Sequence, residues 1–174
     1  SQVSRLLPTI LSRCHKHVCQ LPTEGETVRW LAEQGHQATL AQVRICQGAP
    51  LRVLRYIDEQ QDGKRRELLE SFVSLPLTPT RATHVCSQLA DETQVRLHWL
   101  QLFLCDALKT QAGCGHHQLA MPDLAALSQQ LAEGNSSEKL LEAEQQLVAL
   151  KAACQPGQLS NPTIHLMNWL SRWL

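Results

Sequence analysis

Two short segments combine cysteine with histidine, the side chains that most often bind zinc in proteins. In chain order, the residues of these segments are Cys14, His15, His17 and Cys19, and then Cys114, His116 and His117. Strand alternation would place most of the first set on one face, and the second set lies in a glycine-containing loop without a further ligand pair at zinc-finger spacing. We therefore expect a half-buried strand and a solvated loop, and no metal site.

Arg13 is a second candidate for chemistry, because a guanidinium is permanently charged and its planar fork matches phosphate oxygens. From spacing alone, Arg13 is an ordinary surface arginine before a strand expected at about residues 14–20. It lies, however, in the octet Leu-Pro-Thr-Ile-Leu-Ser-Arg-Cys, residues 7–14. The whole octet resembles the Ser-Arg-Cys motif of bacterial clamp-loader subunits, which are AAA+ proteins.

The resemblance implies a catalytic role for Arg13 as an arginine finger acting in trans, with Ser12 beside it in the motif. In that role, an arginine at a subunit edge reaches the γ-phosphate of a nucleotide bound by the neighbouring subunit and stabilises charge in the transition state. No other residue is given a catalytic role. We expect no cofactor and no metal ion within the chain, and no active site of its own.

The resemblance extends along the chain, because in this family the motif is followed by a strand, a three-helix lid and a helical collar. It implies a remnant of the ATPase-like core over residues 1–20, the lid over residues 21–62 and the collar over residues 63–174. The run Asn161–Leu170 resembles the last collar helix.

The lid of the motor subunits in this family carries a Gly-Ser-x-Arg motif, whose arginine contacts the subunit's own ATP. The matching stretch here is Gly48-Ala49-Pro50-Leu51, so leucine occupies the arginine position. Arg52 is displaced by one residue, which is about 100° around a helix. The sequence also lacks a glycine-rich phosphate loop. These features favour a non-motor subunit of the DNA polymerase III clamp loader.

Such a subunit would help to load the sliding clamp onto primed DNA during replication. The resemblance implies that its collar joins delta-type and gamma- or tau-type subunits in a pentamer. The clamp and the primed DNA would be reached through the assembled complex, and no membrane is expected as a partner.

The elements that must position these residues are helices, and the expected fold class is all-α. Thr23 and Glu26 form a capping box at the start of one helix. The pair Asp62-Gly63 is expected to separate two helices, and the proline-containing segment 75–79 is expected to link two modules. A helix that is apolar nearly all round, over residues 95–108, is expected at the centre of a bundle of five or six helices.

The composition fits a packed globular protein. Apolar residues make up 43% of the 174 residues and charged residues 18%. Sixteen Lys and Arg balance sixteen Asp and Glu, whereas proteins that mainly bind nucleic-acid phosphates usually carry a basic excess. No membrane span or signal peptide is expected. The seven cysteines are odd in number and include no CxxC pair, which favours a reducing, cytoplasmic location.

The remaining charged and titratable groups are expected to be structural. Asp58, Glu59 and Asp62 are expected at a solvated helix terminus. The basic run Lys64-Arg65-Arg66 is expected at a solvated helix start, although it could meet a DNA backbone. His98 is expected to be a structural histidine rather than a catalytic base.

Two other function classes stay open. The segment Thr27–Gly48 fits a helix-turn-helix of a DNA-binding regulator, with Gln42, Arg44 and Gln47 available to read bases. Salt-dependent DNA binding by the chain would favour this class. The chain could also be the C-terminal part of an ATP-hydrolysing gamma- or tau-like motor subunit, and the full-length sequence would decide between the two clamp-loader roles.

Overall fold

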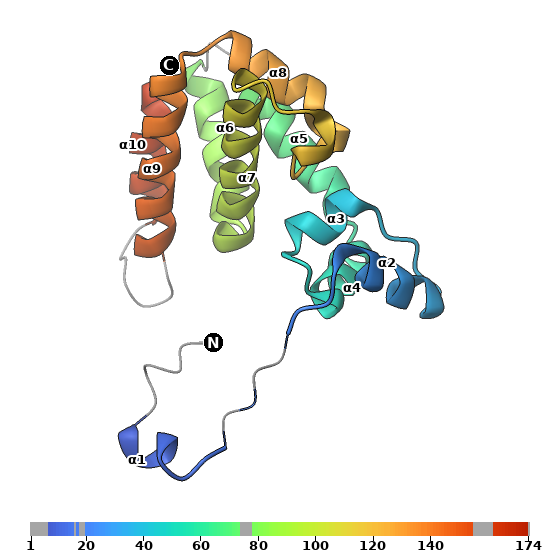
Figure 1. The fold of residues 1–174 in the computed structure, drawn as a ribbon. Coiled ribbons are helices and arrows are strands. Elements are labelled where there is room, and N and C mark those ends of the chain that lie inside the picture. The colour runs from blue at the N-terminus through green and yellow to red at the C-terminus, as the bar shows by residue number, and fades with distance from the viewer. Residues whose placement is uncertain (1–6, 16, 18–19, 74–77, 155–161, 174) are drawn as a thin grey trace.

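The computed structural model describes residues 7–15, 17, 20–73, 78–154 and 162–173, and the regular structure within these ranges is entirely helical (Figure 1). The α-helices are α1 (Pro8–Leu11), α2 (Glu24–Glu33), α3 (Leu40–Ile45), α4 (Pro50–Asp58), α5 (Gln61–Val73), α6 (Pro79–Ala90), α7 (Thr93–Gln111), α8 (Ala125–Glu133), α9 (Ser137–Ala153) and α10 (Pro162–Leu170). The 3₁₀ turns are η2 (His116–Gln118), η3 (Pro122–Leu124) and η4 (Ser171–Trp173). The all-α expectation is confirmed.

Helices α2, α3 and α4 pack against one another, and we call them the three-helix unit. The capping box at the start of α2 is confirmed, because the Glu26 backbone N–H donates to Thr23 Oγ1 and the Thr23 N–H donates to Glu26 Oε2 at 2.7 Å. The same arrangement joins Thr39 and Gln42 at the start of α3. These contacts satisfy backbone N–H groups that the first turn of a helix leaves free.

The break between α4 and α5 falls at Glu59 and Gln60, so the expectation that Asp62-Gly63 forms it was wrong. Gln60 makes the turn by adopting a left-handed backbone conformation with φ of 51°. Asp62 and Gly63 lie in the first turn of α5. The Asp62 side chain serves instead as an acceptor for the side chains of Gln42, Tyr56 and Arg65.

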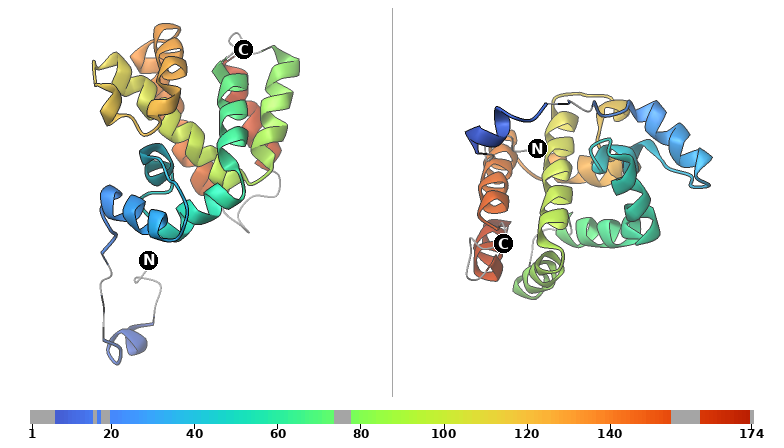
Figure 2. Two further views of the ribbon diagram at one scale, coloured as in Figure 1. Left: turned by 90° about the vertical axis from the view of Figure 1, so that its right-hand side faces the viewer. Right: turned by 90° about the horizontal axis from the view of Figure 1, so that it is seen from below.

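Helices α5 to α10 with η4 form the C-terminal bundle. Helix α7 contacts α5, α6, α8 and α9, and α10 packs against α6 and α9 (Figures 1 and 2). The fully buried apolar side chains of α7 are Leu97, Trp99, Leu100, Phe103, Leu104 and Ala107. Helix α7 contains the segment that the sequence places at the centre of a bundle, and its apolar residues fill the space between its neighbours.

Three aromatic rings join the two ends of the bundle. Phe72 on α5 stacks on Trp169 of α10 with ring centroids 5.7 Å apart, and its edge contact with Trp173 of η4 measures 5.0 Å. All three rings are buried. The last described turn of the chain therefore belongs to the hydrophobic core.

The strand expected at about residues 14–20 is not found among the described residues of that segment. Cys14, His15, His17 and Gln20 lie outside any regular element, whereas residues 16, 18 and 19 lie outside the described residues. A lone strand has no neighbour to satisfy its backbone N–H and C=O groups, which accounts for the wrong expectation. The proposed linker, residues 75–79, also lies largely outside the described residues, and the three regional boundaries remain predictions.

Candidate functional site

Arg13 lies just beyond the short helix α1. Its backbone N–H donates to the Ile10 carbonyl at 3.1 Å, and Ser12 Oγ donates to the Thr9 carbonyl at 3.1 Å. The Arg13 side chain is exposed and forms no ion pair with any described residue. In Figure 1 and in the left view of Figure 2, α1 stands apart from the other helices. The guanidinium is therefore free to contact a group outside the part of the chain described here.

The position that corresponds to the sensor arginine is the second residue of α4. Leu51 stands there with 73% of its side chain exposed. The neighbouring Arg52 turns toward the preceding loop, where its Nη1 donates to Gln47 Oε1 at 3.3 Å. The structure thus places an exposed apolar side chain, without hydrogen-bonding capacity, at this position.

The cysteine and histidine segments do not gather metal ligands in the described part of the chain. No group of three or more His, Cys, Asp or Glu residues there is arranged to hold an ion. Cys19 lies outside the described residues. His116 and His117 form the turn η2, whose backbone is bound by Arg44, so this second segment has a structural role.

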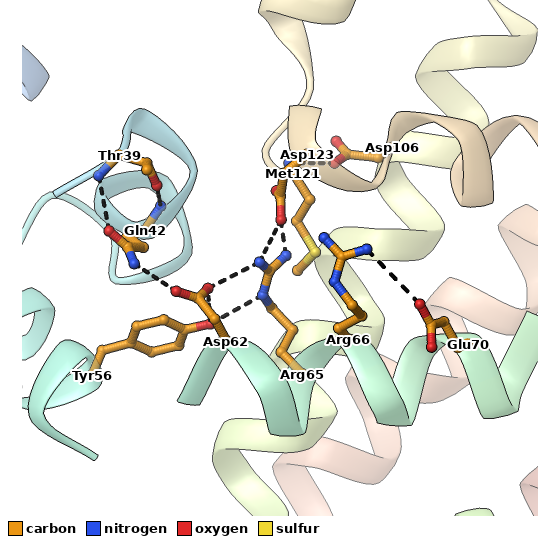
Figure 3. Close-up of polar contacts among 10 residues, drawn as sticks. All are labelled: Thr39, Gln42, Tyr56, Asp62, Arg65, Arg66, Glu70, Asp106, Met121 and Asp123. Atoms are coloured by element: carbon orange, nitrogen blue, oxygen red, sulfur yellow. Dashed lines mark hydrogen bonds and ion pairs between the residues drawn. The ribbon is translucent and has the colours of Figure 1, made fainter. Parts of the chain in front are cut away.

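The basic run Lys64-Arg65-Arg66 is split by the helix it occupies. Arg66 is half exposed and faces Glu70 at 3.8 Å, whereas only 2% of the Arg65 side chain is exposed (Figure 3). Arg65 Nη2 donates to Asp123 at 2.6 Å and to Asp62 at 3.0 Å. The expectation of a solvated basic run was therefore wrong for Arg65, which is an internal cross-link between α5 and η3.

The hydrogen-bond partners of Arg65 keep its guanidinium protonated. Burial disfavours the charged form, but the hydrogen bond to Asp123 and the nearby negative charges hold the pKa of the guanidinium above its ordinary value. Tyr56 completes the cluster by accepting from Arg65 Nε at 3.0 Å and donating to Asp62 at 2.9 Å. Burial raises the pKa of the Tyr56 hydroxyl, so this donor stays protonated.

Asp62 was expected at a solvated terminus with Asp58 and Glu59, and that expectation was wrong for Asp62. Its carboxylate accepts from Gln42 Nε2 at 2.5 Å, in addition to Tyr56 and Arg65 (Figure 3). Asp62 therefore links α3 and α4 to the first turn of α5. The three-helix unit and the C-terminal bundle share one hydrogen-bond network at this point.

A second network holds the segment 116–124 between the two units. Arg44 of α3 donates to the carbonyls of His117 and Leu119 at 2.8 and 2.7 Å, and it also pairs with Glu24 at 2.9 Å. Asp106 is fully buried on α7, and its carboxylate accepts from the N–H groups of Ala120 and Met121 at 2.8 and 2.7 Å. The segment is fixed through its backbone from both sides.

Sequence analysis missed Asp106, although a signal was present. The helix that contains it is apolar nearly all round, so a carboxylate within it must be buried. A buried carboxylate requires several hydrogen-bond donors, which here are the backbone N–H groups that follow the helix. His98, on the same helix, has the expected structural role, since its Nε2 lies 3.2 Å from the Ile45 carbonyl.

Comparison with known proteins relates the chain to the replication machinery of bacteria. Residues 59–174 match the family model described as DNA polymerase III, delta subunit, C terminal. DNA polymerase III subunit delta' of Escherichia coli (strain K12) is 29% identical over 139 residues, which are 78% of this chain and 41% of that protein.

Two further relatives carry the same description. DNA polymerase III subunit delta' of Yersinia pestis is 31% identical over 161 residues, covering 84% of this chain and 45% of the relative. The Pseudomonas aeruginosa protein is 28% identical over 149 residues, covering 80% and 44%. The chain thus spans less than half the length of these curated relatives. None of its described helices has the length and apolar character required to cross a membrane.

The matched region begins at residue 59, next to the break between α4 and α5, and therefore contains the whole C-terminal bundle. The resemblance inferred from the octet near the N-terminus and the family match over the bundle agree, although they rest on different parts of the chain. The chain belongs to the family formed by the C-terminal regions of DNA polymerase III delta subunits, and within it to the delta' type.

Proposed function

We propose that this chain is the assembly portion of a non-motor clamp-loader subunit. In this role, the C-terminal bundle is the collar that joins neighbouring delta-type and gamma- or tau-type subunits in a pentamer. The three-helix unit is the lid, and residues 1–20 are the remnant of the ATPase-like core. The family match over residues 59–174 supports the collar role.

In the same proposal, Arg13 is an arginine finger for ATP bound by a neighbouring motor subunit. The observation that carries it is the exposure of Arg13 within the motif Ser12-Arg13-Cys14, together with the absence of an ion pair to any described residue. A planar guanidinium that has no carboxylate partner within the described part of its own chain is available to a phosphate. The exposed Leu51 at the sensor position supports a subunit that does not hydrolyse ATP itself.

The helix-turn-helix alternative is less well supported, because two of its three base readers are occupied. Gln42 binds Asp62 and caps α3 (Figure 3). Arg44 binds Glu24 and two loop carbonyls. A side chain held in this way cannot reach into a DNA groove. The motor-subunit alternative is disfavoured because the curated relatives are delta' subunits.

The test uses Arg13→Ala and Arg13→Lys in the full-length protein, assembled with the other clamp-loader subunits. ATP hydrolysis in the presence of the sliding clamp and primed DNA is expected to fall for Arg13→Ala. An arginine finger can contribute a factor on the order of 10³ or more at one site, but other sites continue to turn over, so the loss in total rate is partial. Arg13→Lys restores little, since an ammonium lacks the planar fork.

Arg29→Ala is the matched control, because Arg29 is an exposed arginine on α2. Arg13→Ala is also expected to change the free energy of unfolding by no more than about 0.5 kcal/mol, as is typical of an exposed side chain. An Arg13→Ala complex that assembles and hydrolyses ATP at the same rate as the Arg29→Ala complex would show that Arg13 is an ordinary surface arginine. Loss of assembly in both variants would instead count against the lid and collar assignment.

A further inference from the structure

A crevice of about 500 Å³ lies between the three-helix unit and the C-terminal bundle. Its walls come from the end of α3, from α4, from the first residue of α5, and from α7 and α9. This volume lies within the range of pockets that bind small molecules in proteins, so it can also admit a side chain. The distribution of charge within the crevice indicates which kind of group it can bind.

Lys151 of α9 lines the crevice, and its partners among the described residues are neutral. Its Nζ is 3.2 Å from His98 Nδ1 and 3.2 Å from Gln101 Oε1, and no carboxylate in the described part of the chain forms an ion pair with it. The Ile45 carbonyl can only accept, so His98 Nε2 carries the hydrogen and Nδ1 accepts from Lys151. An ammonium has three hydrogens, and one remains available.

Arg52 supplies a second uncompensated charge in the same crevice. It is exposed and donates to the neutral Gln47 side chain, and it forms no ion pair with a described carboxylate. After burial, the charges of Lys151 and Arg52 both lower the pKa of His98. Both cations line the crevice, and both act on the same imidazole.

The crevice also contains two carboxylates, which its own residues already bind. Gln61 Nε2 donates to Glu59 at 3.0 Å and to Glu92 at 3.2 Å, and Arg55 pairs with Glu59 at 2.6 Å. A strand of DNA carries a negative charge about every 3.4 Å, so a nucleic-acid backbone that followed the crevice would meet these carboxylates. A single carboxylate can instead bind to Arg52 and Lys151, whose partners in the described part of the chain are neutral. Val95, which is 42% exposed, adds an apolar wall for an aliphatic stem.

We propose that this crevice binds the carboxylate of an aspartate or glutamate side chain from a partner polypeptide, with Arg52 and Lys151 as the binding cations. Charge-assisted hydrogen bonds from an arginine and a lysine to one carboxylate are short and strong. The incoming charge also compensates Lys151, whose burial without a counter-ion lowers its pKa. The proposal is independent of the clamp-loader role, because it rests only on the charges and geometry of this crevice.

The test is an NMR titration of the protein with a blocked peptide of alternating glutamate and leucine, with a neutral glutamine–leucine peptide in parallel. The acidic peptide is expected to shift the signals of the Lys151 and His98 side chains saturably and to raise the pKa of His98. Arg52→Gln and Lys151→Gln are each expected to weaken binding roughly tenfold or more, the loss typical of a charge-assisted hydrogen bond. The charge-matched control Arg29→Gln binds as the unmodified protein does.

Three results would overturn the proposal: shifts that do not saturate, equal binding of the neutral peptide, or binding by Arg52→Gln and Lys151→Gln that matches Arg29→Gln. A short DNA duplex that shifts the same signals at lower concentration than the peptide would overturn the choice of a polypeptide partner. Unfolding curves of each variant are recorded first. If Lys151→Gln does not fold, binding by Arg52→Gln is still compared with binding by Arg29→Gln, because Arg52 is exposed.

Discussion

Arg65 and Asp123 form an ion pair of 2.6 Å between α5 and η3, although 58 positions separate them in the chain. The guanidinium is almost fully buried, whereas about a third of the Asp123 side chain is exposed. A buried charge with one strong partner is sensitive to loss of that partner. The pair therefore holds the segment 116–124 against the first turns of α5.

Asp123→Asn is expected to lower the free energy of unfolding by about 1–3 kcal/mol, because it leaves the buried Arg65 charge with Asp62 as its remaining carboxylate. Urea unfolding followed by circular dichroism measures the change. Arg66→Gln is the control, because Arg66 pairs with Glu70 at 3.8 Å and both side chains are exposed. This substitution should cost no more than about 0.5 kcal/mol. Equal losses in the two variants would contradict the buried role of Arg65.

Asp106→Asn is expected to cost about 2–4 kcal/mol, because the new amide places one donor group where the carboxylate accepts from two backbone N–H groups. Hydrogen exchange at Ala120 and Met121 should become faster in the variant. Asp58→Asn provides the comparison, as 58% of that side chain is exposed. If the two amides keep their protection in Asp106→Asn, the anchoring role of Asp106 is wrong.

The stability of the protein is expected to depend on pH through His98. Burial, and then the charge of Lys151, lower the pKa of His98 below its ordinary value of 6.5. As the pH falls, the unfolded chain binds this proton first. The stabilisation is complete above pH 6.5 and is lost as the pH falls from 6.5 toward the folded-state pKa.

His98→Gln should flatten this part of the pH profile, because glutamine keeps a donor for the Ile45 carbonyl but does not titrate. The measurement is the free energy of unfolding in urea across this pH range. His84→Gln, which replaces an exposed histidine on α6, should retain the original slope. Parallel profiles for the unmodified protein and His98→Gln would refute the assignment.

Trp173→Ala is expected to destabilise the protein by about 3–5 kcal/mol, as is typical when a buried aromatic side chain is deleted. The ring is 3% exposed and packs on Phe72 and Trp169. Thermal unfolding measures the loss. Leu141→Ala on α9 deletes an apolar side chain that is 49% exposed, so it should have a much smaller effect. Similar melting temperatures for the two variants would show that η4 is not part of the core.

The helical class and several helix starts could be predicted from the sequence, because the signals are local. Thr23 and Glu26 are three positions apart, and the hydrogen bonds they predict need no knowledge of the rest of the fold. The apolar residues of α7 likewise indicate burial by their number alone. Patterns of this kind depend on neighbours along the chain, which the sequence displays directly.

The networks that join the two helical units could not be predicted in the same way. Arg65 sits in a run of three basic residues that looks solvated, and its partner Asp123 is distant in sequence. Asp62 is expected at a solvated helix terminus with Asp58 and Glu59, whereas Gln42 and Tyr56 come to it through the packing of α3 and α4. The contacts of Arg13 could not be predicted either, because its proposed partner lies on another protein.

The hydrogen bonds from Arg44 and Asp106 hold the segment 116–124 through its peptide groups. Arg44 binds the carbonyls of His117 and Leu119, and Asp106 binds the N–H groups of Ala120 and Met121. Every amino acid offers these carbonyls, and every one except proline offers the N–H groups. The hydrogen bonds themselves therefore do not restrict the residue types of this segment, although burial requires apolar side chains at Leu119 and Met121. A single inserted or deleted residue would move all four groups out of register at once.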